Sequence, residues 1–226
     1  MLPDLTTPAG WLPLFFFVAM GIAVLSYVVL DGYDLGVGLL LNRTADHNKD
    51  MMIASIGPFW DANETWIVLG VGLLLVAFPL AHGLVLTELY LPVTAMLIGL
   101  ILRGVSFDFR VKVDISQKPL WNFLFYLGSL IASVAQGVMI GRLIVGFESG
   151  LLGWMFALLV GICLPAGYAL LGSTWLILKT EGELQKQAMG WAKISLWLTA
   201  GGIGLVSIAT PYFSAEIMSK WFVMPN

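Results

Sequence analysis

The sequence is poor in the residue types that build disulfide frameworks and metal centres. It contains one cysteine, Cys163, and two histidines, His47 and His82, among 226 residues. One cysteine cannot form a disulfide within the chain. Because His47 is expected in a loop outside the membrane, the chain also lacks the paired histidines that a bis-histidine haem site needs.

Charged residues are scarce as well. Only 11% of the residues are charged, whereas about 25% are charged in typical soluble domains. The net charge is -3, and no basic tract typical of nucleic-acid binding and no low-complexity segment is present. Hydrophobic residues make up 59% of the chain, a composition that indicates a membrane protein.

Six segments are apolar enough to cross a membrane, which takes roughly 20 residues per helix. Since every backbone polar group in lipid must be paired internally, we predict an all-α membrane protein. The first segment lacks the basic start and the cleavage site of a signal peptide, so we expect it to be retained. The predicted spans are about 11–33, 57–80, 84–106, 121–146, 152–178 and 190–211.

Basic residues gather on one side of this predicted topology. The side that carries the loops after the first, third and fifth spans holds most of the lysines and arginines. They are Arg43, Lys49, Arg103, Arg110, Lys112, Lys118, Lys179, Lys186 and Lys193. By the positive-inside rule this side is cytoplasmic, and the N-terminus is predicted to face outward.

Ionisable residues form three clusters at the ends of the first three spans, all on this basic side. They are Asp31 and Asp34 of DGYDLGVG, Asp61 and Glu64 of IGPFWDANETW, and Arg103, Asp108 and Arg110 of RGVSFDFR. Acids three positions apart share one helical face, and the glycines of the first motif permit close approach of another helix. We therefore expect an internal ion network between carboxylates of the first two spans and arginines of the third.

Two interpretations of this network stay open. In the structural one, Arg103 neutralises Asp34 or Asp61 and only holds the helices together. In the functional one, Asp61 and Glu64 relay protons from the cytoplasm. Two adjacent acids cannot both ionise cheaply in a low dielectric, so one of them tends to hold a proton, as a relay requires.

Five motifs together resemble subunit II of the cytochrome bd-type quinol oxidases, in the cyanide-insensitive branch. In chain order they are DGYDLGVG, IGPFWDANETW, FPLAH, LRGVSFDFR and GSTWLILKTEGELQ. The resemblance implies a multi-pass protein of the bacterial inner membrane with a periplasmic N-terminus, paired with a haem-bearing subunit I. It implies that haems b and d and the quinol site lie on that partner, where dioxygen is reduced to water.

The resemblance also implies roles for single residues. Asp61 matches the acidic residue on the family's proton path, and Trp60 is its motif neighbour. Asp34 and Arg103 resemble the acidic and basic residues at the ends of the first and third helices. Glu64 fits one version of the motif, so it is expected as an auxiliary member of a path through Asp61, Glu64 and Asp34.

Members of this family usually have eight membrane helices in two four-helix bundles. Residues 1–147 are therefore predicted to form the first bundle, and residues 148–226 to supply two helices of the second. The chain is expected to be either a truncated or a short form without the last two helices. Exposed faces on its fifth and sixth helices would then need another protein to cover them.

Two other function classes remain as alternatives. One is a secondary transporter or proton channel, which the crowding of ionisable groups at one membrane face makes less favoured. The other is a purely structural assembly subunit. The partners expected for the chain are subunit I, membrane lipid and quinone.

Overall fold

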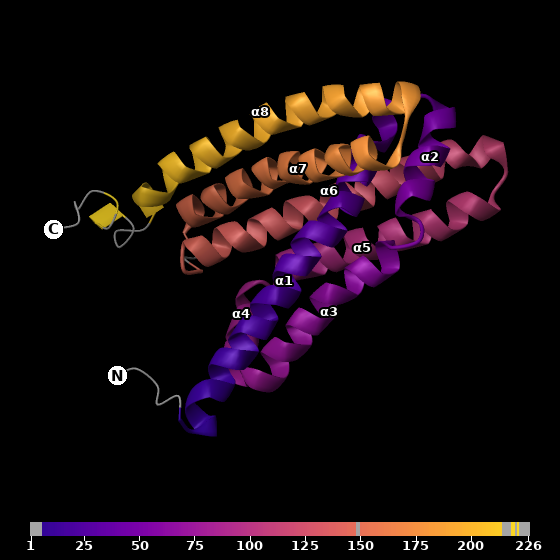
Figure 1. Cartoon of the computed structure of the whole chain (residues 1–226). Helices are drawn as coiled ribbons and strands as arrows, with labels where there is room; N and C mark the ends of the chain where they lie inside the picture. The colour runs from indigo at the N-terminus through magenta and orange to yellow at the C-terminus, as the bar shows by residue number, and fades with distance from the viewer. Residues whose placement is uncertain (1–5, 148–149, 214–217, 220, 222–226) are drawn as a thin grey trace.

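The computed structural model describes residues 6–147, 150–213, 218, 219 and 221, and in these ranges all regular secondary structure is helical (Figure 1). Eight α-helices follow one another in the described ranges. They are α1 (Pro8–Leu40), α2 (Asp46–Ile56), α3 (Trp60–Ala77), α4 (Pro79–Glu88), α5 (Tyr90–Lys112), α6 (Lys118–Ile144), α7 (Leu151–Lys179) and α8 (Gly182–Phe213). Two short 3₁₀ turns, η1 (Leu41–Arg43) and η2 (Ile115–Gln117), connect them.

Six of these helices, α1, α3, α5, α6, α7 and α8, are long and apolar enough to span a membrane. The predicted all-α membrane fold with about six spans is therefore confirmed. The spans differ from the predicted ones mainly at their ends, because several helices continue past the apolar core of the sequence. α8, for example, already begins at Gly182, within a stretch predicted to be a loop.

A further difference is α2, which occupies part of a segment predicted to be a loop. Its last turns bury Met52, Ile53 and Ile56 against the ends of α1, α6 and α7.

The predicted second and third spans are also divided differently, because the helix is interrupted at Phe78 and again at Leu89. Proline removes a backbone donor and clashes with the preceding turn, so Pro79 starts the short helix α4 instead of extending α3.

The helices form two arms that meet near the C-terminal half of α1. Figure 1 shows α6, α7 and α8 side by side, while the first half of α1 runs away from them together with α3. Burial agrees with this arrangement, since the buried residues of α1 begin only at Ala23. The core therefore lies where α1 crosses α6 and α7, and long apolar faces of α1, α3 and α8 remain exposed.

Glycines make the crossing of α1 and α7 close. A Cβ atom added to Gly36 would overlap the backbone of Tyr168, and one added to Gly172 would overlap the backbone of Gly36. Gly32 also faces the ring of Tyr168, where an added Cβ would lie 2.9 Å from the nearest ring carbon. The expectation that the glycines of DGYDLGVG admit another helix at short range is confirmed.

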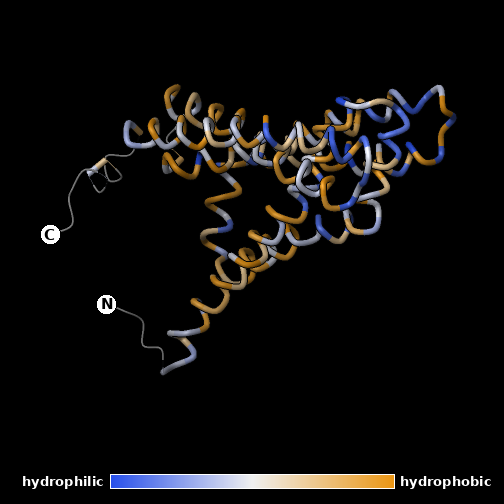
Figure 2. Tube along the Cα trace, turned by 45° about the horizontal axis from the view of Figure 1, so that its top comes forward, coloured by the Kyte–Doolittle hydropathy of each residue, from blue (hydrophilic) through white to orange (hydrophobic). Residues whose placement is uncertain are grey.

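One end of the molecule is hydrophilic. Figure 2 shows blue segments gathered at this end, whereas the arms are mostly orange. The end carries α2, the connection from α5 to α6 and the connection from α7 to α8. We call it the basic end, and it is marked by Arg43, Lys49, Arg110, Lys112, Lys118, Lys179 and Lys186.

Candidate functional site

A buried guanidinium group joins three of the membrane helices. Arg103 of α5 is only 1% exposed, and its Nη2 lies 2.5 Å from Oδ1 of Asp31 in α1. The same nitrogen lies 2.8 Å from Oε2 of Glu64 in α3. Because a buried charge is stable only with close partners, these contacts fix α1, α3 and α5 relative to one another. One carboxylate from each of the first two spans thus pairs with an arginine of the third.

The partners of Arg103 differ from the expected ones. The structural interpretation paired it with Asp34 or Asp61, whereas the ion pairs in the structure use Asp31 and Glu64. In each motif the two acids are three positions apart and point about 60° away from each other around the helix. The rotation of each helix about its axis therefore decides which acid meets Arg103, and sequence spacing alone does not fix that rotation.

Asp34 is fully buried beside this network, and its hydrogen-bond partner is a neutral side chain. The side-chain amide of Asn63 donates a hydrogen bond to Asp34 Oδ2 at 2.9 Å. Asn63 Nδ2 also lies 2.6 Å from the hydroxyl oxygen of Tyr33, whose ring stacks on Trp175 with centroids 4.1 Å apart. Sequence analysis missed Asn63, although it stands inside the quoted motif and is a polar residue between two acids.

Asp61 and Asp108, two members of the predicted site, are not part of this network. Both side chains are exposed, and within residues 6–147 and 150–213 neither takes part in an ion pair. Asp61 precedes Glu64 by one helical turn on the outer surface of α3. Its motif neighbour Trp60 is half-buried and packs against Phe107 of α5, with ring centroids 4.9 Å apart.

Arg110 belongs to a second cluster at the basic end rather than to the network around Arg103. Its Nε donates to Asn122 Oδ1 at 2.5 Å, and its Nη2 lies 2.7 Å from Asp50 Oδ1. Lys118 approaches the same carboxylate at 3.3 Å. Partial burial opposes ionisation of Asp50, but the hydrogen bonds and charges of Arg110 and Lys118 outweigh it and lower the pKa of Asp50 below its ordinary value.

The buried cluster around Arg103, which also contains Asp31, Asp34 and Glu64, has more acids than bases. Asp34 lies within electrostatic range of Asp31, Glu64 and Arg103. With three negative charges against one positive charge, the fully ionised cluster would carry a net charge of −2. Uncompensated charge in the hydrocarbon region of a membrane is costly, and a net charge of −2 would be unfavourable even toward one end of the spans.

Several polar atoms of this cluster are buried without a hydrogen-bond partner among the described residues. They are Asp31 Oδ2, Asp34 Oδ1, Arg103 Nε and Arg103 Nη1. An unpaired buried polar atom is costly, and buried polar groups of this kind are usually bridged by water. Water at these atoms would supply the missing hydrogen bonds.

Two buried tyrosines extend the polar region toward α6 and α7. Gln136 Nε2 donates to the hydroxyl of Tyr27 at 2.7 Å, and the hydroxyl of Tyr168 donates to Gln136 Oε1 at 2.5 Å. Tyr27 lies one helical turn before Asp31 in α1. Sequence analysis missed this chain of hydrogen bonds, although Gln136 is a conspicuous polar residue inside a long apolar helix.

The part of the chain that the structure describes contains no group of three His, Cys, Asp or Glu side chains able to hold a metal ion. His47 lies in α2 at the basic end, and His82 lies in α4, beyond the far end of α3. The two histidines are therefore separated by the length of a membrane span. The residues of this chain do not fit a haem held by two histidines.

Two known proteins with similar sequences carry closely related names. The chain is 30% identical over 88% of its length to "Cytochrome bd ubiquinol oxidase subunit 2" of Bacillus subtilis, covering 61% of that protein. It is 27% identical over 85% of its length to "Cytochrome bd-I ubiquinol oxidase subunit 2" of Escherichia coli K12, covering 55% of that protein. The chain thus spans little more than half the length of these relatives. The family described as cytochrome bd terminal oxidase subunit II matches residues 12–225, and the chain belongs to this family.

Proposed function

We propose that the chain is the non-haem subunit II of a membrane quinol:dioxygen oxidoreductase in the bacterial inner membrane. Membership in the family supports this role, as do the six membrane-spanning helices and the names of the two relatives. In this proposal a partner subunit I holds haems b and d and oxidises quinol. The large exposed apolar faces of α1, α3 and α8 suit contact with that partner and with lipid.

The basic end is proposed to face the cytoplasm, with the N-terminus on the periplasmic side. The excess of lysine and arginine at this end supports that orientation under the positive-inside rule. The acid cluster would then lie near the inner leaflet. Protons consumed in the reduction of dioxygen could reach it from the cytoplasm without crossing the whole membrane.

We further propose that Asp61, Glu64 and Asp34 form a proton path. The observation that carries this proposal is the position of Glu64, which contacts Arg103 at 2.8 Å while 28% of its side chain remains exposed. Glu64 thus connects the surface of α3 with the buried acids. Asp61, exposed one turn earlier, would collect protons, and the surplus of acids over bases leaves room for a proton in the cluster.

A purely structural role is the second candidate, and the double ion pair of Arg103 favours it. A guanidinium bonded to one carboxylate from α1 and one from α3 ties these helices to α5, which suits a structural clamp. A transporter is supported less well, because the buried charges gather toward one end of the helices rather than at the membrane centre. The proton path and the structural role predict different effects of neutral substitutions on turnover and on haem content.

The test uses Glu64→Gln and Asp61→Asn in the assembled oxidase, with quinol oxidation rate and haem absorbance measured on the same preparations. A proton path predicts that Glu64→Gln lowers turnover per haem by about 100-fold, in the range of a lost proton-transfer group, while haem content stays normal. Asp61→Asn should lower turnover in the same direction. Asp108→Asn, which removes another exposed acid from the third span, is the matched control and should leave turnover unchanged.

The structural role predicts the opposite pattern. Glu64→Gln would then reduce the amount of assembled, haem-containing enzyme, while each remaining complex turns over at the normal rate. Normal turnover and normal haem content in both variants would refute the proton path. A loss of turnover in Asp108→Asn equal to that in Asp61→Asn would show an effect of surface charge instead.

A further inference from the structure

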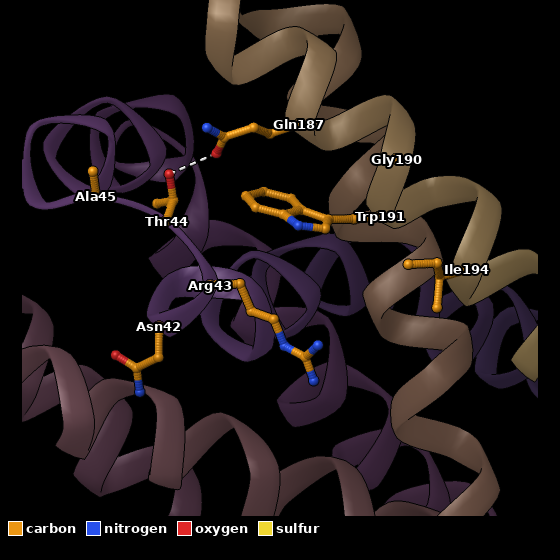
Figure 3. Close-up of a pocket in the computed structure, with 8 residues that line it drawn as sticks. All are labelled: Asn42, Arg43, Thr44, Ala45, Gln187, Gly190, Trp191 and Ile194. Carbon is orange, nitrogen blue, oxygen red and sulfur yellow. Dashed lines mark hydrogen bonds between the residues drawn. The ribbon is translucent and has the colours of Figure 1, made fainter.

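An open cavity lies at the basic end, where α1 ends and α8 begins. It has a volume of about 520 Å³ and is bordered by η1, the link to α2 and the first turns of α8. Figure 3 shows Arg43 and Thr44 on one side and Gln187 and Trp191 on the other, with the indole ring of Trp191 between Gln187 and Arg43. Two segments far apart in the sequence therefore build one site.

One wall of this cavity is fixed by its own hydrogen bonds. The hydroxyl of Thr44 donates to Gln187 Oε1 at 2.8 Å and accepts from Asn48 Nδ2 at 3.0 Å. Gln187 Nε2 in turn donates to Glu183 at 3.1 Å. These polar groups already have partners, so they hold α2 against α8 and do not compete for a ligand.

Arg43 is the charged member of the lining, which contains no carboxylate. It is exposed, and among the described residues it forms no ion pair. By contrast, Arg103 and Arg110 are buried and paired with acids. The cavity therefore presents one positive charge without an ion-pair partner among the described residues, at the hydrophilic end of the spans. Beside it is Trp191, an aromatic residue of the kind that favours membrane interfaces.

A second cavity of about 290 Å³ continues from the first, since Arg43, Trp191 and Ile194 border both. It runs along α8 from Trp191 to Leu198, over Ala166 of α7. At a rise of 1.5 Å per residue, this stretch of α8 is about 10 Å long. The groove is bordered mainly by apolar side chains and leads from the basic end toward the middle of the membrane.

We infer that these two cavities together bind an anionic phospholipid of the leaflet at the basic end. Arg43 contacts the phosphate, Trp191 lies beside the glycerol region, and one acyl chain fills the groove along α8. The positive charge of Arg43 favours an anionic lipid, since each interfacial Arg or Lys attracts such lipids by about 1 kcal/mol. The apolar groove that begins at Arg43 argues against a free phosphate ion as the ligand, because such an ion would leave the groove empty.

The test measures which lipids stay bound to the protein, purified with its accompanying subunits and reconstituted into nanodiscs of phosphatidylglycerol and phosphatidylcholine in equal amounts. After extraction into mild detergent, native mass spectrometry counts the retained lipids. The wild-type protein should retain phosphatidylglycerol in preference to phosphatidylcholine. Arg43→Gln should reduce this preference about five-fold, the ratio that corresponds to one interfacial cation.

Two further variants separate this site from general effects. Lys112→Gln removes another exposed cation from the same end, outside both cavities, and should leave the lipid preference unchanged. Ala166→Phe fills the groove and should reduce retention of both lipids. Adding glycerol phosphate in excess should not displace the retained lipid, because it has no acyl chain.

Three results would overturn the inference. Equal losses in Arg43→Gln and Lys112→Gln would show attraction to the surface as a whole. Unchanged retention in Ala166→Phe, or no retained lipid in the wild-type protein, would show that another segment of protein covers the groove. None of these results would bear on the proton path, which is tested by turnover at a separate cluster.

Discussion

Removing the guanidinium of Arg103 should destabilise the protein more than any other single loss of charge in the described part of the chain. The proposed change is Arg103→Met, which keeps an extended side chain but removes the positive charge. Asp31 would then remain 0% exposed, without the cation that lies 2.5 Å from it. Glu64 would suffer less, because 28% of its side chain is exposed and can be hydrated.

The magnitude follows from the burial of the pair. Breaking a buried ion pair by removing one partner costs about 3–5 kcal/mol. For a chain of this size, each kcal/mol changes the melting temperature by about 2–4 °C. A decrease of about 10 °C in apparent Tm is therefore expected for Arg103→Met.

The assay is thermal unfolding in detergent, followed by tryptophan fluorescence at one fixed heating rate, because unfolding of such proteins is commonly irreversible. The decisive comparison is the double variant Arg103→Met with Asp31→Asn. Removing both charges avoids an unpaired buried ion, so the double variant should recover most of the lost stability. A double variant less stable than Arg103→Met, or a single variant that melts within about 2 °C of the wild type, would refute the buried-pair argument.

Two further predictions concern other parts of the fold. Gly36→Ala should lower the apparent Tm, because its Cβ would overlap the backbone of Tyr168, and overpacking costs about 1–3 kcal/mol. Gly72→Ala, whose Cβ would meet nothing within 4 Å, is the matched control and should be neutral or slightly stabilising. Asp50 has a lowered pKa, so its pairing with Arg110 stabilises the fold above the ordinary carboxyl pKa, and this contribution is lost as the pH falls through the lowered value. The difference in Tm between wild type and Asp50→Asn should therefore shrink between pH 7 and about pH 3. The difference is expected to be small even at pH 7, because the Asp50 side chain is 55% exposed. A difference that grows as the pH falls would contradict the pairing.

Much of the fold follows from apolar length alone. A run of about 20 apolar residues must become a membrane helix, which is why all six spans could be predicted. The short helix α2 could not, because its sequence DHNKDMMIASI is polar for half its length. Its helix is stabilised by tertiary burial of Met52, Ile53 and Ile56, and such contacts between distant segments are not visible in local composition.

The candidate site was predictable in composition but not in pairing. Because a charged side chain in lipid needs a partner, Asp31, Glu64 and Arg103 could be predicted to pair, and they do. The choice of Asp61 as the main acid rested on family resemblance, whereas the structure places this side chain on the surface of α3. The role of Asp61 on a proton path stays a prediction. Whether Asp61 can pass protons inward depends on what covers the surface of α3.

The packing of α1 against α7 goes together with the choice of Asp31 as a partner of Arg103. Gly36 and Gly172 are in close contact where α1 crosses α7, and in this orientation of α1 Asp31 pairs with Arg103. We expect the glycine contact to hold α1 in this orientation. The predicted division of the chain at residue 147 stays a prediction, but α7, from the second part, packs against α1, from the first. Substitutions in α7 should therefore change the acid cluster although α7 contributes no member to it. If Asp31 and Arg103 stayed paired when this glycine contact was disrupted, the ion pair itself, and not the helix crossing, would determine the orientation of α1.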